Sequence, residues 1–368
     1  MGYSSIAIAQ AENTDYYGSL SSFDAHATIK GPCGDTMDFW LLIKNNRIDK
    51  ISFTTDGCVS SRACGSMTCI MAQGKYLDEA FNISQEMVLD ALGEFPESSA
   101  HCALLATNTL KAAIQEYKGI LRINQIKNKI LITSGKGGVG KSTVAVHIAK
   151  GLVDKGYKVG LLDVDLHGPS IPALLGISVS GLLQGSDGLI PVDMEGLKVM
   201  SIGFLLKSSD DAVAWRGPRK HAVIRQFLRE VEWGDLDYLI IDSPPGTGDE
   251  LMSVYQNAGI LMGAIVVTTP QKIAAYDVRK SITFCKDLKI PILGLVENMS
   301  GFICPKCGEQ IEFFPKGAVN DICKEMNVIC IGSIPMNREL ARAADLGQIE
   351  PISAEFLKII NHLIKEKK

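Results

Sequence analysis

The sequence lacks three features that would point away from an ordinary globular protein. Its longest apolar stretch, around residues 258–267, contains glycines and is too short to cross a bilayer. The N-terminus has neither the basic start nor the long apolar core of a secretory signal, so we expect a cytoplasmic protein with no membrane partner. No block of lysine or arginine occurs, and the net charge is −4, which argues against a nucleic-acid partner.

Cysteine is missing from the middle of the chain. The ten cysteines form two groups of five, one before residue 103 and one after residue 284. In a chain of 368 residues without a secretory signal, so many thiols favour metal binding or reactive thiols over disulfides. The cysteine-free middle holds a nucleotide-binding motif instead.

The pattern of apolar residues divides the chain into two domains. Residues 1–118 combine short strand-like runs, such as FWLLIK and RIDKISFTT, with helical patterns, which predicts a small α+β domain. In residues 128–368, apolar strands such as KILITS and YLIIDSPPG alternate with longer helical segments, which predicts an α/β domain with a mostly parallel sheet. Residues 119–127 are expected to link the domains, although their isoleucines argue against a floppy linker.

A phosphate-binding loop is the strongest motif in the sequence. The segment ITSGKGGVGKST follows a predicted strand and fits the pattern G-x-x-x-x-G-K-[ST]. Glycines in such a loop let backbone N–H groups face phosphates at a helix N-terminus, whereas a glycine-rich turn without function would not need the whole pattern. Lys141 is expected to neutralise the β- and γ-phosphates of ATP, and Ser142 to bind Mg²⁺. The predicted nucleotide-binding residues of the loop are Gly135, Lys136, Gly137, Gly138, Val139, Gly140, Lys141, Ser142 and Thr143.

Three aspartates follow predicted strands of the parallel sheet. Asp163 and Asp165 end one strand and Asp242 ends another, so all three can meet beside the loop at the carboxyl edge of the sheet. Asp242 is expected to hold Mg²⁺ through water, Asp163 could do likewise, and Asp165 is best placed to orient the attacking water. For each aspartate taken alone, the alternative to a role in ATP chemistry is a structural one, in which the side chain caps the turn at the end of its strand.

The loop also contains a lysine that ordinary P-loops do not require. Lys136 directly follows the first glycine, and a solvated surface charge is the alternative role for it. The segment GKGGVGKST resembles the deviant Walker A motif of SIMIBI-class ATPases, in which this lysine reaches across a dimer to the partner's nucleotide. The resemblance implies a nucleotide-sandwich homodimer in which Lys136, Lys141 and Asp165 are the catalytic residues.

Cys304 and Cys307 form a C-x-x-C pair, which is half of a metal site because zinc and iron–sulfur sites normally take four ligands. The segments SGKGGVGKST, DVDLHGPS, WRGP, LDYLIIDSPPGTGD, VENMSGFICPKCG and GSIPMN resemble the Mrp/ApbC/Nbp-type iron–sulfur carrier ATPases from residue 128 onward. The resemblance implies a [4Fe-4S] cluster bridged by the cysteine pairs of both subunits, and contact of Asn298 with adenine. His147 stands where that family usually has Asn, and we expect it to pack without affecting catalysis.

A zinc site within one chain is the alternative, because Cys323 and Cys330 follow the pair. Their separation fits the second half of a zinc ribbon poorly. Cys330 lies in the apolar segment NVICIGSIP, which predicts a buried strand, and Cys323 lies in a predicted helix. We therefore expect both to pack as small apolar side chains.

The N-terminal domain contains cysteines beside His and Asp that could bind a soft metal ion or a cluster. The alternative is that these cysteines are buried and only structural. The segments GPCGDTM, TTDGCVSSRA, GKYLDEA and AHCALLATNTLKAAIQEYK resemble the IscU/NifU N-terminal scaffold over about residues 12–118. The resemblance implies that three cysteines hold a transient iron–sulfur cluster, or zinc, and that the aspartate keeps the cluster labile. The expected ligands are Cys33, Cys58 and Cys102, assisted by Asp35 and His101.

These features predict assembly of iron–sulfur clusters on the first domain and their ATP-dependent transfer to recipient apoproteins by the second, with slow ATP hydrolysis. A cysteine desulfurase is the expected sulfur donor. The alternatives are a zinc-stabilised ATPase of the partitioning or positioning type and a zinc-stabilised regulatory module with structural nucleotide. A partitioning ATPase would need a basic surface or an amphipathic terminal helix. The remaining N-terminal cysteines, Cys64 and Cys69, are expected to be buried.

Overall fold

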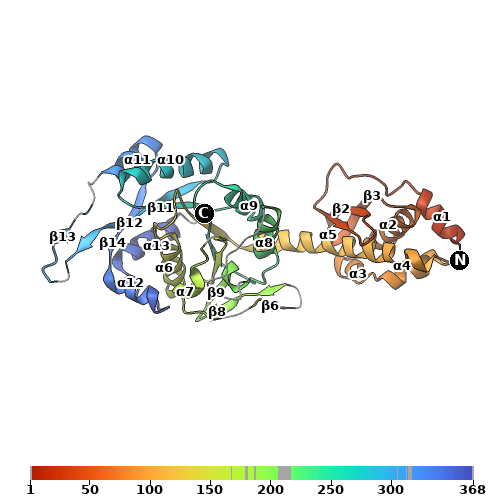
Figure 1. Cartoon of the computed structure of the whole chain (residues 1–368), viewed down its shortest axis with the longest axis horizontal. Helices are drawn as coiled ribbons and strands as arrows, with labels where there is room; N and C mark the ends of the chain where they lie inside the picture. The colour runs from red at the N-terminus through yellow and green to blue at the C-terminus, as the bar shows by residue number, and fades with distance from the viewer. Residues whose placement is uncertain are drawn as a thin grey trace. The chain divides into compact units, whose positions relative to one another are not determined.

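The computed structural model of the chain forms two compact units, Met1–Leu121 and Arg122–Lys368 (Figure 1). The structure describes residues 2–166, 168–178, 181–185, 188–205, 217–304, 306–311, 313 and 317–366. The predicted α/β class, with a small first domain and a mostly parallel second sheet, is confirmed.

The first unit contains an antiparallel sheet in the order β1-β2-β3, packed against helices. Asn45 and Asn46 both have positive φ, 52° and 60°, and form the tight turn between β2 and β3. Phe39 and Phe53 pack into the core of this unit beneath helix α2. The elements are α1 (Ser5–Glu12), β1 (Ala25–Lys30), β2 (Thr36–Lys44), β3 (Arg47–Thr55), α2 (Val59–Ala72), α3 (Leu77–Phe81), α4 (Gln85–Leu92), η1 (Glu97–Ser99) and α5 (His101–Gln125).

The second unit is built on a nine-stranded sheet, counted over the described residues, in the order β13-β12-β11-β4-β10-β5-β9-β8, with β14 also paired to β12. Strands β4, β5, β9, β10, β11, β12 and β14 run parallel, whereas β8 and β13 pair antiparallel. The strands are β4 (Asn128–Ser134), β5 (Val159–Asp163), β6 (Leu183–Gln184), β7 (Leu189–Ile190), β8 (Val192–Met194), β9 (Leu197–Ser201), β10 (Tyr238–Asp242), β11 (Gly263–Thr268), β12 (Ile292–Ile303), β13 (Gln310–Ile311) and β14 (Cys330–Met336).

The central strands β4, β10 and β11 are buried along their whole length because helices pack against the sheet. Strand β10 lies between β4 and β5, and the register pairs Asp242 with Asp163. The carboxyl ends of these strands therefore meet at the edge where the P-loop leaves β4. The helices are α6 (Lys141–Asp154), α7 (Ile171–Leu174), η2 (Ile202–Leu205), α8 (Gly217–Arg229), α9 (Asp249–Asn257), α10 (Lys272–Asp287), α11 (Ala318–Met326), α12 (Arg338–Asp345) and α13 (Ala354–Lys365).

Most of the predicted linker, residues 119–127, is helical. Helix α5 begins at His101 and continues to Gln125, and β4 begins three residues later. Ile123 and Ile126 are buried in the core of the second unit. The apolar residues of this segment are therefore explained by burial.

Candidate functional sites

The P-loop owes its shape to glycines at positions where a side chain would be strained. Gly140 has φ of 82°, and a Cβ atom on it would lie 2.1 Å from Nδ2 of Asn298. A Cβ atom on Gly135 would lie 2.4 Å from the backbone of Asp277. Helix α6 begins at Lys141, directly after the loop, so its unpaired N–H groups and its dipole favour an anion there.

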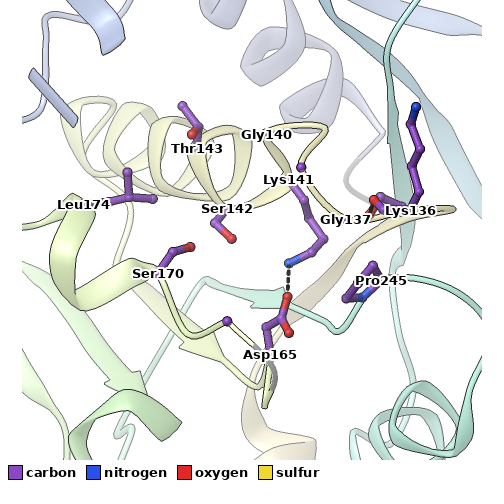
Figure 2. Close-up of a pocket in the computed structure, with 13 residues that line it drawn as sticks. Lys136, Gly137, Gly140, Lys141, Ser142, Thr143, Asp165, Ser170, Leu174 and Pro245 are labelled. Atoms are coloured by element: carbon purple, nitrogen blue, oxygen red, sulfur yellow. Dashed lines mark hydrogen bonds and ion pairs between the residues drawn. The ribbon is translucent and has the colours of Figure 1, made fainter. Parts of the chain in front are cut away.

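Lys141 and Ser142 converge on one buried carboxylate. The Lys141 Nζ atom lies 2.6 Å from Oδ1 of Asp242 and 3.4 Å from Oδ2 of Asp165, the second contact being drawn in Figure 2. Ser142 Oγ donates to Oδ2 of Asp242 over 2.5 Å. Burial opposes the charge on Lys141, but the two carboxylates raise the pKa of its ammonium group above the ordinary value. The lysine is therefore held charged where phosphates would approach.

Asp163 has different surroundings from the other two aspartates. Its carboxylate is fully buried and accepts hydrogen bonds from Ser201 Oγ at 2.8 Å, Asp165 N at 3.1 Å and Ile171 N at 3.4 Å. Burial and the nearby charge of Asp242 raise the pKa of Asp163 to about 8. These contacts fix the loop after β5 and occupy oxygen lone pairs of Asp163 that a metal-bound water would otherwise use.

Two cavities meet at the start of α6. One, of about 430 Å³, is lined by the P-loop glycines, Lys141, Ser142 and Asp165, and suits phosphates. The other, of about 530 Å³, is mainly apolar and suits a base. Gly140 and Thr143 line both cavities, so one nucleotide can occupy the two together. The remaining walls of the second cavity include Asn298, Met299, Phe302, Phe313, Pro335 and Arg338.

Asn298 and Lys136 contact other parts of the second unit. Nδ2 of Asn298 donates to the carbonyl of Val139 over 2.9 Å, so this side chain holds the P-loop as well as lining the apolar cavity. Nζ of Lys136 donates to Oε1 of Gln271 over 2.9 Å. In Figure 2 the Lys136 side chain extends away from Lys141.

His147 packs against an aromatic ring, which agrees with the packing role expected for it. Its ring stacks on Phe356 with centroids 4.6 Å apart, and Nδ1 donates to the carbonyl of Thr143 over 2.8 Å. Burial lowers the pKa of His147, which favours the neutral ring.

The C-x-x-C pair lies at a tight hairpin. Cys304 directly follows β12, and β13 pairs with the end of that strand. The amide of Gly308 donates to the carbonyl of Cys304 over 2.8 Å, which closes the turn. The N–H groups of Cys307 and Lys306 lower the pKa of the Cys304 thiol. The Cys307 side chain is exposed and that of Cys304 is half-buried, so both thiols are accessible.

The expectation that Cys330 is buried is wrong. Cys330 is exposed because β14 pairs only with β12 among the described strands, and the start of this edge strand faces solvent. Cys323 is half-buried on α11, and burial, followed by the charge of Cys330, raises the pKa of Cys323 to about 11. Within the described ranges, neither thiol groups with Cys304 or Cys307 as a set of three metal ligands.

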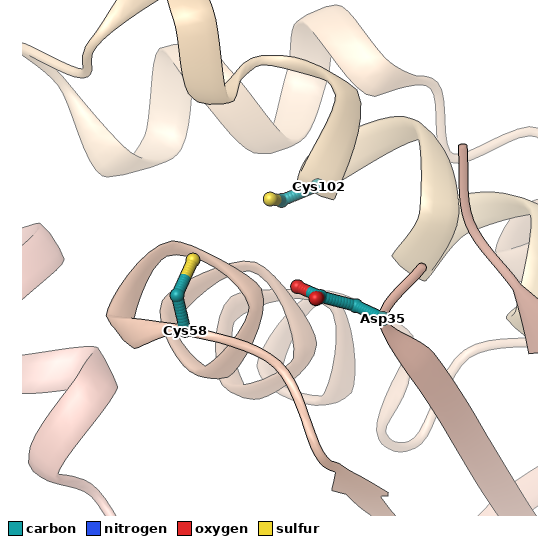
Figure 3. Close-up of side chains that lie close together, drawn as sticks. All are labelled: Asp35, Cys58 and Cys102. Carbon is teal, nitrogen blue, oxygen red and sulfur yellow. The ribbon is translucent and has the colours of Figure 1, made fainter. Parts of the chain in front are cut away.

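The first unit brings together three of the five expected ligands. The ligand atoms of Asp35, Cys58 and Cys102 all lie within 4.8 Å of one another, and their side chains converge in Figure 3. His101 borders the group, with Nε2 3.6 Å from Sγ of Cys102. Cys33 is exposed and lies outside this group of three, although its charge acts on Cys102.

The two grouped thiols have opposite pKa shifts. Burial raises the pKa of Cys102, in the first turn of α5, to about 11. Cys58 is the N-cap of α2, where partial burial opposes ionisation but the N–H groups of Ser61 and Ser60 lower the pKa of the thiol. The site therefore contains one readily formed thiolate and one buried thiol.

Two residues of this site were not predicted. The Ser61 Oγ atom lies 2.8 Å from Oδ2 of Asp35, 3.4 Å from Sγ of Cys102 and 4.0 Å from Sγ of Cys58. Gly57 leaves room for these atoms, because a Cβ atom on it would lie 2.3 Å from Asp35 Oδ2. The available signal was that Ser61 follows Cys58 by three residues, which places the two on one side of a helix.

Cys64 and Cys69 are both buried, as predicted. Cys64 lies close enough to the site for the charges of Cys102 and Cys58 to act on it, and burial is the main reason that its pKa is well above the ordinary value. Burial also raises the pKa of Cys69. Both side chains therefore remain neutral thiols that pack in the core.

Comparisons with known proteins match both units. A family model described as NUBPL iron-transfer P-loop NTPase matches residues 125–366, and one described as the NifU-like N-terminal domain matches residues 2–123. The chain is 52 % identical over 231 residues to the "Cytosolic Fe-S cluster assembly factor NUBP2 homolog" of Nematostella vectensis, which covers 61 % of this chain and 86 % of that protein. It is 45 % identical over 260 residues to the "Iron-sulfur cluster carrier protein" of Methanocaldococcus jannaschii, which covers 69 % and 90 %.

A solved structure is also similar to the second unit. The nucleotide-binding protein of Archaeoglobus fulgidus, in complex with ADP, is 40 % identical with a TM-score of 0.58, over 65 % of this chain and 94 % of that chain. Across the described part of the chain, no helix has the length and apolar character needed to span a membrane.

Proposed function

The chain belongs to the family of NUBPL-type iron-transfer P-loop NTPases, and we propose that it assembles iron–sulfur clusters on its NifU-like unit and delivers them from its P-loop unit. Both resemblances inferred from the sequence are confirmed, and the partitioning alternative is not favoured. The protein is an ATPase that takes part in iron–sulfur assembly and transfer. The observation that carries the proposal is the grouping of Asp35, Cys58 and Cys102 in a chain that also presents an accessible C-x-x-C pair.

ATP binds with its phosphates at the P-loop and its base in the apolar cavity beside Asn298. Lys141, already held charged by carboxylates, neutralises the phosphates. Ser142 and Asp242 hold Mg²⁺, whose oxygen preference fits a hydroxyl and a carboxylate that lie 2.5 Å apart. Asp165 lines the phosphate cavity and orients the attacking water. Lys136 completes the nucleotide site of a partner subunit by exchanging its bond to Gln271 for a phosphate.

A [4Fe-4S] cluster is carried between two copies of the chain. The C-x-x-C pair supplies two accessible thiols, and the lowered pKa of Cys304 favours the thiolate that binds iron. Two copies would supply the four ligands that such a cluster takes. The recipients are apo iron–sulfur proteins.

The NifU-like unit holds the nascent cluster as cargo. Cys58 offers a thiolate at a helix N-terminus, and Cys102 and the Asp35 carboxylate lie within 4.8 Å of it. Cys33, whose charge acts on Cys102, and His101, whose Nε2 lies 3.6 Å from Sγ of Cys102, complete the ligand set. The sulfur donor is a cysteine desulfurase, and the protein works in the cytoplasm.

The test is anaerobic reconstitution of the full chain with iron and sulfide, followed by metal analysis, absorption spectra and native mass. The wild type should carry one [4Fe-4S] cluster per two C-x-x-C pairs, and Cys304→Ser with Cys307→Ser should abolish that cluster and activation of an apo [4Fe-4S] enzyme. The matched variant, Cys323→Ser with Cys330→Ser, removes two thiols from the same unit and should retain both. A monomer carrying a full cluster on its C-x-x-C pair would contradict the bridging arrangement.

A further inference from the structure

Ser61 occupies the centre of the ligand group in the first unit. Its side chain is fully buried, and its hydroxyl oxygen lies between the ligand atoms of Asp35 and Cys102, at 2.8 Å and 3.4 Å. A hydroxyl has one proton to donate and two lone pairs. Ser61 can therefore donate its one proton to the Asp35 carboxylate or to the Cys102 sulfur, and can still accept a hydrogen bond from the Cys58 thiol.

The Asp35 carboxylate lies among contacts from more than one segment of the first unit. Gly57 lies against it, and a Cβ atom there would be 2.3 Å from Oδ2 of Asp35 and 2.6 Å from Oγ of Ser61. The loop after Asp35 is fixed in turn, because the amide of Thr36 donates to Oδ1 of Asp56 over 2.5 Å. The hydroxyl of Ser61 is thus one of several contacts that determine where this carboxylate points.

The neighbouring serines of the same helix differ in their partners, and the hydroxyl of Ser60 also helps to lower the pKa of Cys58. Oγ of Ser60 lies 2.6 Å from the hydroxyl of Tyr3, and Oγ of Ser66 donates to Oε1 of Gln10 over 2.7 Å. Ser66 is as fully buried as Ser61 but has no recorded contact with the ligand group. The helix therefore contains a matched pair of serines, of which only one faces the ligands.

We propose that Ser61 is a positioning residue, which holds the Asp35 carboxylate and the Cys102 sulfur in the arrangement that receives a metal ion. The inference rests on the proposed role of this group in cluster assembly. Partners that orient metal ligands by hydrogen bonds typically change metal affinity by 10- to 100-fold when they are removed. Because Ser61 acts through two ligands, its loss should weaken metal binding without removing a ligand.

The experiment uses Co²⁺ as the probe, in the full chain carrying Cys304→Ser and Cys307→Ser. Thiolate-to-cobalt absorption then reports thiol sites, and Co²⁺ bound to oxygen ligands at the P-loop does not contribute to it. Ser61→Ala should weaken Co²⁺ binding about tenfold. Ser61→Thr, which keeps the hydroxyl, should restore most of the affinity, and Ser66→Ala should leave it unchanged.

A double-mutant cycle with Asp35→Ala separates positioning from general loss of structure. If Ser61 acts through Asp35, adding Ser61→Ala to Asp35→Ala should cost clearly less than tenfold. Thermal unfolding of metal-free Ser61→Ala and Ser66→Ala is compared with that of the parent chain. This comparison measures how much stability the loss of a buried hydroxyl costs in each variant.

Undiminished Co²⁺ affinity in Ser61→Ala would overturn the proposal, and so would tighter binding, which would mean that the hydroxyl competes with the metal. An equal loss in Ser66→Ala would also overturn it. Failure of the assembly site itself has a different signature: Cys58→Ser with Cys102→Ser would then leave the absorption intact.

Discussion

The two candidate sites differ in how the chain builds them. At the P-loop, consecutive residues form most of the site, since the backbone from Gly135 to Gly140 leads directly into α6 and Lys141. In the first unit, the ligands come from separate segments: Asp35 precedes β2, Cys58 caps α2, and Cys102 lies in α5. A site of the first kind is a property of the local sequence, whereas one of the second kind depends on the tertiary fold.

The sites also differ in the charges that they bury. The P-loop unit buries a lysine among carboxylates, which suits a charged phosphate ligand. The first unit places thiols and one carboxylate around a neutral hydroxyl, and one of the thiols has a pKa of about 11. The P-loop site therefore offers hard oxygen ligands, whereas the site in the first unit offers mainly soft sulfur ligands.

The largest expected effect sharpens the contrast within the soft site. Cys58, with a lowered pKa, should react with iodoacetamide below pH 9, whereas at pH 8 only about 0.1 % of a thiol with a pKa near 11 is thiolate. Alkylation of Cys102 should therefore be at least about 100-fold slower and should still accelerate above pH 9. Mass spectrometry of the metal-free chain, digested after timed labelling, measures both rates. Equal rates at pH 8 would show that the pKa values are not separated.

A second comparison, between Lys141→Ala and Asp165→Ala, separates ATP binding from ATP hydrolysis at the P-loop. Lys141→Ala should weaken ATP binding about 100-fold, because it removes the cation that neutralises the Asp242 and Asp165 carboxylates beside the phosphates. Asp165→Ala should leave binding within a few-fold and slow hydrolysis about 100-fold, since orienting the water acts mainly in the transition state. Calorimetric titration and phosphate release measure the two quantities. Equal loss of ATP binding in both variants would mean that these roles are divided wrongly.

The smallest expected effect concerns the contact between Asn298 and the loop. Asn298→Ala removes one hydrogen bond to the Val139 carbonyl and part of the apolar cavity wall, so ATP affinity should fall up to about tenfold. Ser300→Ala, two residues further along the same strand, serves as the control, since Ser300 does not line either nucleotide cavity. Unchanged affinity for ATP in Asn298→Ala would show that the loop keeps its shape without this bond.

The sequence predicted the P-loop residues because they are contiguous and their types are dictated by backbone conformation. It also predicted the two chemistries and the α/β class. It did not reveal Ser61, because a serine in a helix carries no sign of which group its hydroxyl will meet. Cys330 was placed in the core because its neighbours are apolar, and apolar composition alone does not distinguish an edge strand from a central one.

Strand β12 connects the nucleotide site of the P-loop unit to its cysteine pair. Asn298 holds the Val139 carbonyl, and Cys304 follows six residues later, at most about 20 Å away along an extended strand. Between them the register against β14 shifts, with Asn298 opposite Ile334 and Phe302 opposite Met336, so four steps on β12 match two on its neighbour. The surplus backbone forms an irregular segment between the two contacts. The residue that holds the P-loop and the cysteine hairpin thus lie on one strand but are not joined by an unbroken ladder of pairs with β14.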